Sequence, residues 1–201
     1  MDRKCLSLSV AAVFLLICLY YRGGFMLLPI VAIPAAVHEL SHILTLRLLG
    51  QRITGIVPDA RGLCICYDGP CSAAGHILAA LAGPVGGAAY AFIASSLAGA
   101  PGCEWIHHSA GMSMLLTAYN LLPILPLDGG RILSVLCAEY LGMERGTALF
   151  GKVSGVFLAL LLTGSAALIV LKKTTIPLAA AIWLLLFQND EEALVKSGEI
   201  I

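Results

Sequence analysis

The stretch from Phe25 to Leu49, FMLLPIVAIPAAVHELSHILTLRLL, is almost unbroken in its apolar character. It is longer than the roughly 20 residues that an α-helix needs to span a bilayer. Within it lie His38, Glu39 and His42, the H-E-x-x-H pattern. Residues four apart share one face of a helix, so both imidazoles can bind one zinc ion while Glu39 serves a bound water. The stretch therefore predicts a membrane-spanning helix that carries a chemical site.

Two other interpretations of the pattern are a buried polar network without metal and a coincidence among the five histidines of the chain. Placing polar groups at membrane depth costs roughly 2–4 kcal/mol per charged group unless they are paired or bound to metal. This cost argues against coincidence. We therefore favour the metal site.

The composition of the whole chain is that of a membrane protein. Of its 201 residues, 59% are hydrophobic and only 12% charged, with a mean hydropathy of +0.93. The apolar segments are continuous and do not alternate with period two, which predicts an all-α fold, a polytopic helix bundle of about six spans, and excludes a transmembrane barrel. The predicted spans are Cys5–Tyr21, Phe25–Leu49, Ala73–Leu97, Met112–Pro126 continuing into Ile132–Leu141, Ala148–Leu171 and Ile176–Phe187.

We expect one integral-membrane domain over residues 1–201. The net charge is zero and no basic tract is interleaved with aromatic residues. These features give no sign of a nucleic-acid partner.

The residues between Gln51 and Ser72 differ from the apolar spans. Two short β-prone runs, Ile53–Val57 and Leu63–Tyr67, flank a Pro58–Gly62 turn. This arrangement predicts a β-hairpin over Ile53–Tyr67 directly after the second span. The hairpin could lie at the membrane surface or dip into the membrane beside the site and offer an unpaired edge to an extended peptide. It could also be a connector without further function.

A second informative stretch, NLLPILPLDGGR, runs from Asn120 to Arg131. Its two prolines break a helix and free backbone groups, which membrane proteins tolerate only where the backbone is buried or lines a cavity. Asp128 follows in this unusual setting and is our candidate for the third protein ligand that a catalytic zinc site needs. Its alternative role is the N-cap of a helix over Gly129–Leu141. Three other acids have ordinary surroundings in loops or at helix ends: Glu104, Glu139 and Glu144.

The remaining histidines and the cysteines are weaker candidates. His76 could be a fourth ligand, but a surface or hydrogen-bonded histidine is the simpler interpretation. We expect His107 and His108 to be exposed in a loop between Gly99 and Ser109. The seven cysteines are interpreted as free thiols and small hydrophobic residues. A second metal site is a weak alternative for three of them: Cys64, Cys66 and Cys71.

The distribution of Lys and Arg predicts the orientation of the chain in the cell membrane. If the N-terminus is inside, nine of the twelve basic residues fall in inside segments and three in outside segments. By the positive-inside rule, both termini are then cytoplasmic. The second and fourth spans run in the same direction in this multi-pass topology, so that His38, His42 and Asp128 can meet in the cytoplasmic half of the bilayer.

The motif HELSH in one span and NLLPILPLDGG in a later one resemble, in this order, the two motifs of the site-2 protease family of intramembrane zinc metalloproteases. The likeness looks closest to the bacterial stage IV sporulation protease branch. Gly83 and Pro84 look like the glycine-proline of the family's middle helix. One departure is Leu121, where a proline often follows the motif asparagine.

The resemblance implies a three-helix catalytic core over about residues 25–141. His38, His42 and Asp128 would be the zinc ligands and Glu39 the general base. Asn120 would hold the substrate backbone. The implied substrate is a membrane-embedded or membrane-associated protein, for example a transcription-regulator precursor, cleaved in or near the cytoplasmic half of the bilayer; a membrane regulatory partner is a further expectation.

Two other functions remain alternatives. A zinc or proton transporter could use the same ligands, but it predicts further polar residues along a path through the membrane. A non-catalytic relative that binds membrane clients is also consistent with the apolar spans. Such a relative would be expected to lack Glu39, which is present.

Overall fold

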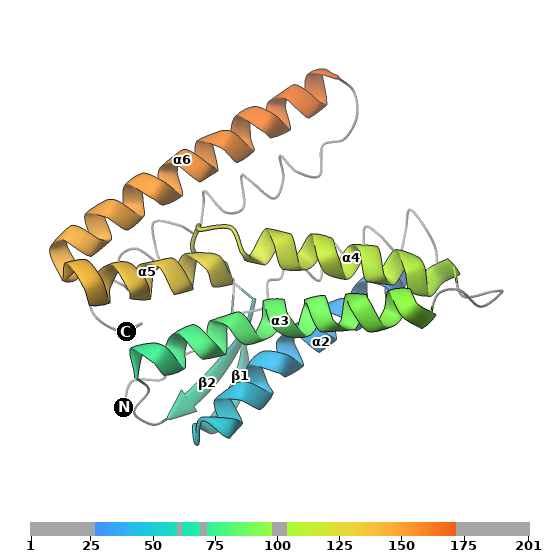
Figure 1. Ribbon diagram of the computed structural model, residues 1–201, viewed down its shortest axis with the longest axis horizontal. Helices are drawn as coiled ribbons and strands as arrows, with labels where there is room; N and C mark the ends of the chain where they lie inside the picture. Colours follow the sequence, from blue (N-terminus) through green and yellow to red (C-terminus); the bar gives the residue numbers. More distant parts are fainter. Residues whose placement is uncertain (1–26, 60–61, 69–71, 98–103, 172–201) are drawn as a thin grey trace. The chain divides into compact units, whose positions relative to one another are not determined.

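The structure is a computed structural model and describes residues 27–59, 62–68, 72–97 and 104–171 (Figure 1). These residues divide between two compact units, Met1–Asn120 and Leu121–Ile201, and each unit is described by itself. In chain order the elements are α2 (Leu27–Leu48), β1 (Arg52–Asp59), β2 (Gly62–Asp68), α3 (Ala73–Leu97), α4 (Glu104–Asn120), α5 (Asp128–Leu141) and α6 (Met143–Val170).

Three of the described helices are long and apolar enough to cross a membrane: Leu28–Leu48, Ala73–Leu97 and Met143–Ala167. They also carry large apolar side chains on their outer faces, including Leu48, Phe92 and Leu160. Exposed apolar surface of this kind suits a lipid environment. The helical character of the fold is thus confirmed, whereas the number of six spans stays a prediction. The predicted spans Cys5–Tyr21 and Ile176–Phe187 lie outside the described residues.

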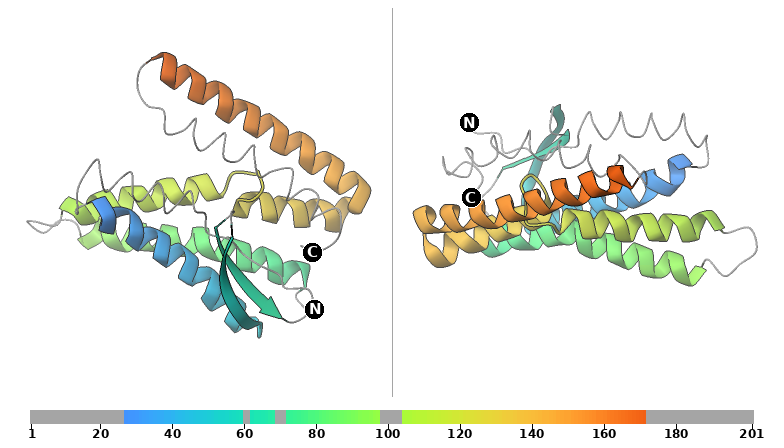
Figure 2. Two further views of the ribbon diagram at one scale, coloured as in Figure 1. Left: turned by 180° about the vertical axis from the view of Figure 1, so that it is seen from behind. Right: turned by 90° about the horizontal axis from the view of Figure 1, so that it is seen from above.

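In the first unit, α3 and α4 run antiparallel and side by side, and α2 packs against both (Figure 2). The buried residues of α3 are small, and all but the first lie three or four positions from another of them, as residues on one helix face do: Gly75, Ala80, Gly83, Pro84, Gly87, Ala91 and Ala94. Small residues at such spacing let helix backbones approach closely. This face of α3 determines how near α2 and α4 can come.

α2 ends at Leu48, one residue before the end of the predicted span. Arg47 lies in its last turn, and Gly50 takes a positive φ of 77° that glycine adopts without strain. The Gly50 N–H donates to the Arg47 carbonyl and the Gln51 N–H to the Leu46 carbonyl, both at 3.0 Å. The chain then turns directly into β1.

The predicted hairpin is present, because β1 and β2 pair antiparallel with Ile53 opposite Tyr67. The predicted turn over Pro58–Gly62 was too long, however. Pro58 pairs with Leu63 and Asp59 with Gly62, so the strands continue to within two residues of each other. An extended strand at a sheet edge accepts the φ of proline, which explains why Pro58 does not end β1.

The start of α4 corrects the prediction of a loop from Gly99 to Ser109 and of a span beginning at Met112. The helix begins at Glu104, where an acid in the first turn is favourable, and His108 Nδ1 donates to the Glu104 carbonyl at 2.7 Å. His107 and His108 are exposed as predicted. The helix ends at Asn120 and not at Pro126, because Pro123 cannot continue it.

In the second unit, residues 121–127 fold back over the first turn of α5. Ile124 and Leu125 are fully buried, and the Leu127 N–H donates to the Ile124 carbonyl at 2.9 Å. A Cβ on Gly130 would lie 2.6 Å from the Leu125 nitrogen. Glycine is therefore required where this segment crosses α5. The second unit continues through the positive-φ Gly142 into α6, which begins five residues before the predicted Ala148.

We predict that Gly130→Ala destabilises the second unit by about 1–3 kcal/mol, because the added methyl overlaps backbone that cannot move away. The measurement is the thermal unfolding midpoint of the purified chain in detergent. Gly155→Ala on α6 is the matched control, since its Cβ meets nothing within 4 Å. The control should leave the midpoint unchanged or raise it. Equal midpoints for both variants would contradict the close crossing.

Candidate metal site

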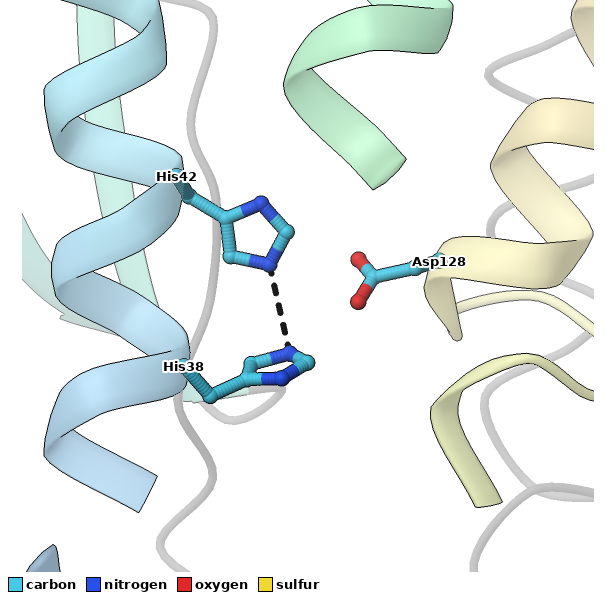
Figure 3. A group of neighbouring side chains, drawn as sticks. All are labelled: His38, His42 and Asp128. Carbon is cyan, nitrogen blue, oxygen red and sulfur yellow. Dashed lines mark hydrogen bonds between the residues drawn. The ribbon is translucent and has the colours of Figure 1, made fainter. Parts of the chain in front are cut away.

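His38 and His42 lie on one face of α2 and are turned toward α3. Their side chains are 3% and 4% exposed, and their Nε2 atoms are 3.2 Å apart (Figure 3). The four-residue spacing in the sequence thus produces the neighbouring imidazoles that were predicted. Two ring nitrogens that face each other in a buried setting are donors of the kind that a metal site needs.

The orientation of His42 is determined by a hydrogen bond to α3. Its Nδ1 lies 2.7 Å from the Ala79 carbonyl oxygen. A carbonyl can only accept, so Nδ1 carries the proton and Nε2 presents a lone pair. This is the arrangement in which metal-binding histidines are usually held, with the outer ring nitrogen bonded to a carbonyl or carboxylate.

The space for both imidazoles is provided by Gly83 of α3. A Cβ on Gly83 would lie 2.6 Å from His38 Nε2 and would overlap His42 Nε2 as well. Gly86, one turn further along α3, is similarly needed beside Ser41, whose hydroxyl donates to the Val37 carbonyl at 2.7 Å. The glycines of α3 therefore serve the site directly and not only the general packing of helices.

Glu39 and Asn120 also belong to the first unit. Glu39 follows His38 on α2 and is half-buried. Asn120 is the last residue of α4, also half-buried, and its side-chain nitrogen donates to the Leu116 carbonyl at 3.0 Å. Asn120 therefore has a defined side-chain orientation at the point where the helix breaks.

Asp128 is the first residue of α5 in the second unit, and it is 6% exposed. The alternative role as N-cap is wrong, because the N-cap position is held by Leu127. The helix dipole favours an ionised carboxylate in the first turn.

The donors of the first unit fit a zinc ion. Two nitrogen ligands of a tetrahedral zinc with metal–nitrogen distances of 2.0–2.1 Å are separated by about 3.3 Å. The 3.2 Å between the Nε2 atoms of His38 and His42 matches this edge. The site could therefore accept a metal without rearrangement of α2.

The other candidate ligands lie in different surroundings. His76 Nδ1 lies 3.4 Å from the Tyr67 hydroxyl, so this histidine connects the start of α3 to β2. Cys137 is a free, buried thiol, as expected of a small hydrophobic residue. Five further acids and histidines are exposed: Glu104, His107, His108, Glu139 and Glu144. The side chains of Cys64, Cys66 and Cys71 lie outside the described part.

Several contributions to the site carried no residue-specific signal in the sequence. The Ala79 carbonyl is a backbone group, and any residue could have supplied it. Gly83 and Gly87 are four residues apart, a spacing that indicates a common helix face but not what this face contacts. Only the packing of α2 on α3 shows which side chains this face receives.

Comparisons with known proteins agree with this geometry. The model of Peptidase family M50 matches residues 76–163, a range that includes Asn120 and Asp128 but begins after the H-E-x-x-H pattern. Among solved structures, the chain is similar to the Site-2 Protease from Methanocaldococcus jannaschii, with a TM-score of 0.66 and 18% identity over 91% of this chain and 86% of that chain. The fold resembles that of a site-2 protease. A comparison with curated proteins finds no match.

A peptidase family model, this similar fold and three apolar helices together fit an intramembrane protease. The family-model match covers less than half of the chain, and the structural likeness concerns the fold alone. Any chemical activity of this chain therefore has to be inferred from the residues of the site.

We predict that Gly83→Ala lowers zinc affinity by more than about tenfold, because the methyl displaces both imidazoles. Zinc binding by the purified chain in detergent measures this effect. Gly111→Ala on α4 is the matched control, since its Cβ meets nothing within 4 Å, and it should bind zinc as wild type does. Undiminished binding by Gly83→Ala would contradict the assigned position of the imidazoles.

Proposed function

We propose that this chain is an intramembrane zinc metalloprotease that hydrolyses a peptide bond of a membrane-embedded or membrane-associated protein. The observation that carries the proposal is the buried pair of imidazoles, 3.2 Å apart, beside Glu39 on a helix long and apolar enough to span a membrane. A soluble zinc site would not need such a helix. The peptidase family model and the site-2 protease fold support the same conclusion.

Asp128 supplies the third ligand in this proposal. His38, His42 and Asp128 are each buried, and two imidazoles with one carboxylate are donor types that zinc accepts. Two nitrogens and one carboxylate oxygen leave the fourth position of a tetrahedral zinc open for water, as catalytic sites require. The position of Asp128 at the start of a helix favours the ionised form that binds metal.

A zinc ion bound here would supply Lewis acidity, which polarises the scissile carbonyl and makes a bound water a nucleophile near neutral pH. Glu39 accepts the proton of this water on its carboxylate and passes it to the leaving amine nitrogen. The surrounding apolar helices exclude bulk water from the reacting groups.

The substrate must be extended at the cleavage site, because a helix engages its own peptide groups in hydrogen bonds. The hairpin of β1 and β2 is a two-stranded sheet, and each strand has an outer edge that could pair with an extended segment. Asn120, at the break after α4, is proposed to hold the substrate backbone. Helix-breaking residues in the target would assist both steps.

The finer features of the protein also belong to this proposal. They are a single domain over residues 1–201 with its core at about 25–141, about six spans, and both termini in the cytoplasm. The proposal also includes the sporulation protease branch and a regulatory membrane partner. The sequence motifs and the distribution of basic residues support these features.

We predict that Glu39→Gln retains zinc but lowers cleavage by roughly 10²–10⁴-fold, because the amide cannot accept the proton of the water. Cleavage of a co-expressed single-span membrane substrate and zinc content are measured together. Glu144→Gln, a change at an exposed acid, is the control and should cleave as wild type does. Retained cleavage by Glu39→Gln would exclude Glu39 as the base.

We further predict that Asp128→Asn lowers zinc affinity, because a charged ligand becomes neutral. The decrease should exceed the roughly 10–100-fold that typically follows loss of a residue hydrogen-bonded to a metal ligand. Metal content after purification and dialysis is the measurement. Glu139→Gln changes an exposed acid of the same helix and should keep its zinc. If Asp128→Asn kept a full equivalent of zinc, another residue would be the third ligand.

A further inference from the structure

A row of hydroxyl side chains lies between α3 and α4. Ser109, Ser113 and Thr117 follow each other at intervals of four along α4, and all three are buried. The Ser109 hydroxyl forms a hydrogen bond of 2.8 Å with the Tyr90 hydroxyl, and the Ser113 hydroxyl donates to the Gly87 carbonyl at 2.8 Å. These two residues connect the helices, as hydroxyl groups commonly do in membranes.

Thr117 differs from the other members of the row. It is 7% exposed, and its Oγ1 has no hydrogen-bond partner among the described residues. A threonine in a helix can satisfy its hydroxyl on the carbonyl four residues earlier, as Thr147 and Thr163 do. Leaving a buried hydroxyl unsatisfied is destabilising, because the hydrogen bonds it made to water are not replaced. The orientation of Thr117 therefore requires an explanation.

The Thr117 hydroxyl is directed toward Gly87 and the outer side of His38. A Cβ on Gly87 would lie 2.6 Å from Thr117 Oγ1 and 3.9 Å from His38 Nδ1. Both atoms thus flank the same point, in the space that the missing side chain of Gly87 leaves. The two atoms are therefore at most 6.5 Å apart, a range in which a side-chain rotation or one bridging water molecule can join them.

We propose that Thr117 is a positioning residue that accepts a hydrogen bond from Nδ1–H of His38 and so directs Nε2 of His38 toward the metal. The inference rests on the proposed function. The proposed bond corresponds to the one that His42 makes, in which Nδ1 donates to the Ala79 carbonyl. The two ligands would then be oriented from two different helices, His42 by α3 and His38 by α4.

Thr117→Val removes the hydroxyl and keeps the shape of the side chain. It should lower zinc affinity of the full chain in detergent by about 10–100-fold, as loss of such a partner typically does. Thr117→Ser restores the hydroxyl and should bind zinc within about twofold of wild type, which a purely steric role would not produce. The matched control is Thr163→Val, a change at an exposed threonine of α6.

The outcomes separate this inference from the proposed function. Wild type that binds no zinc and cleaves no substrate would overturn the metalloprotease itself. Wild type that binds zinc, together with Thr117→Val of equal affinity, would overturn only the role of Thr117. If Thr117→Val does not purify in folded form, ¹⁵N NMR of the zinc-loaded wild type provides the test. The His38 signals are assigned as those missing in His38→Gln. A proton on Nδ1 of His38 supports the inference, and metal on Nδ1 overturns it.

Discussion

The hydrogen bond from His42 Nδ1 to the Ala79 carbonyl connects the two helices on which the site is built. It can form only because α2 and α3 approach closely at Gly83, where any side chain would occupy the space of the imidazoles. A buried imidazole that is misplaced cannot turn to bulk water for its hydrogen bonds. Helix packing and ligand orientation are therefore one constraint, and a change in either alters the other.

The two units contribute to the proposed chemistry in different ways. The first holds two nitrogen donors and a neighbouring carboxylate on a long apolar helix. The second holds Asp128 at the start of α5, under a segment that crosses the helix against Gly129 and Gly130. Residues 121–127 interrupt the helical chain between α4 and α5, so that a carboxylate is presented from a helix terminus rather than from a continuous span. Such an interruption is tolerated where the backbone is buried, as it is at Ile124 and Leu125.

The local features were predicted well where the pattern of residues left few alternatives. The bounds of the helix over Ala73–Leu97 and the presence of a hairpin after α2 were confirmed. The errors arose where local preference was weak. The start of α4 was placed too late because Trp105 to Ser109 has no strong helical period, and the hairpin turn was too long because Pro58 was interpreted as a breaker although it pairs within β1.

The sequence by itself determined the helical class, the apolar spans, the pair of histidines with Glu39, and the break between Asn120 and Asp128. These follow from composition and from spacing along the chain, which act over a few residues. Only the tertiary structure decided that His42 is oriented by the Ala79 carbonyl, that Gly83 makes room for both imidazoles, and that Thr117 is turned toward Gly87. These contacts join residues that are far apart in sequence, and their geometry depends on how closely the helix backbones pack.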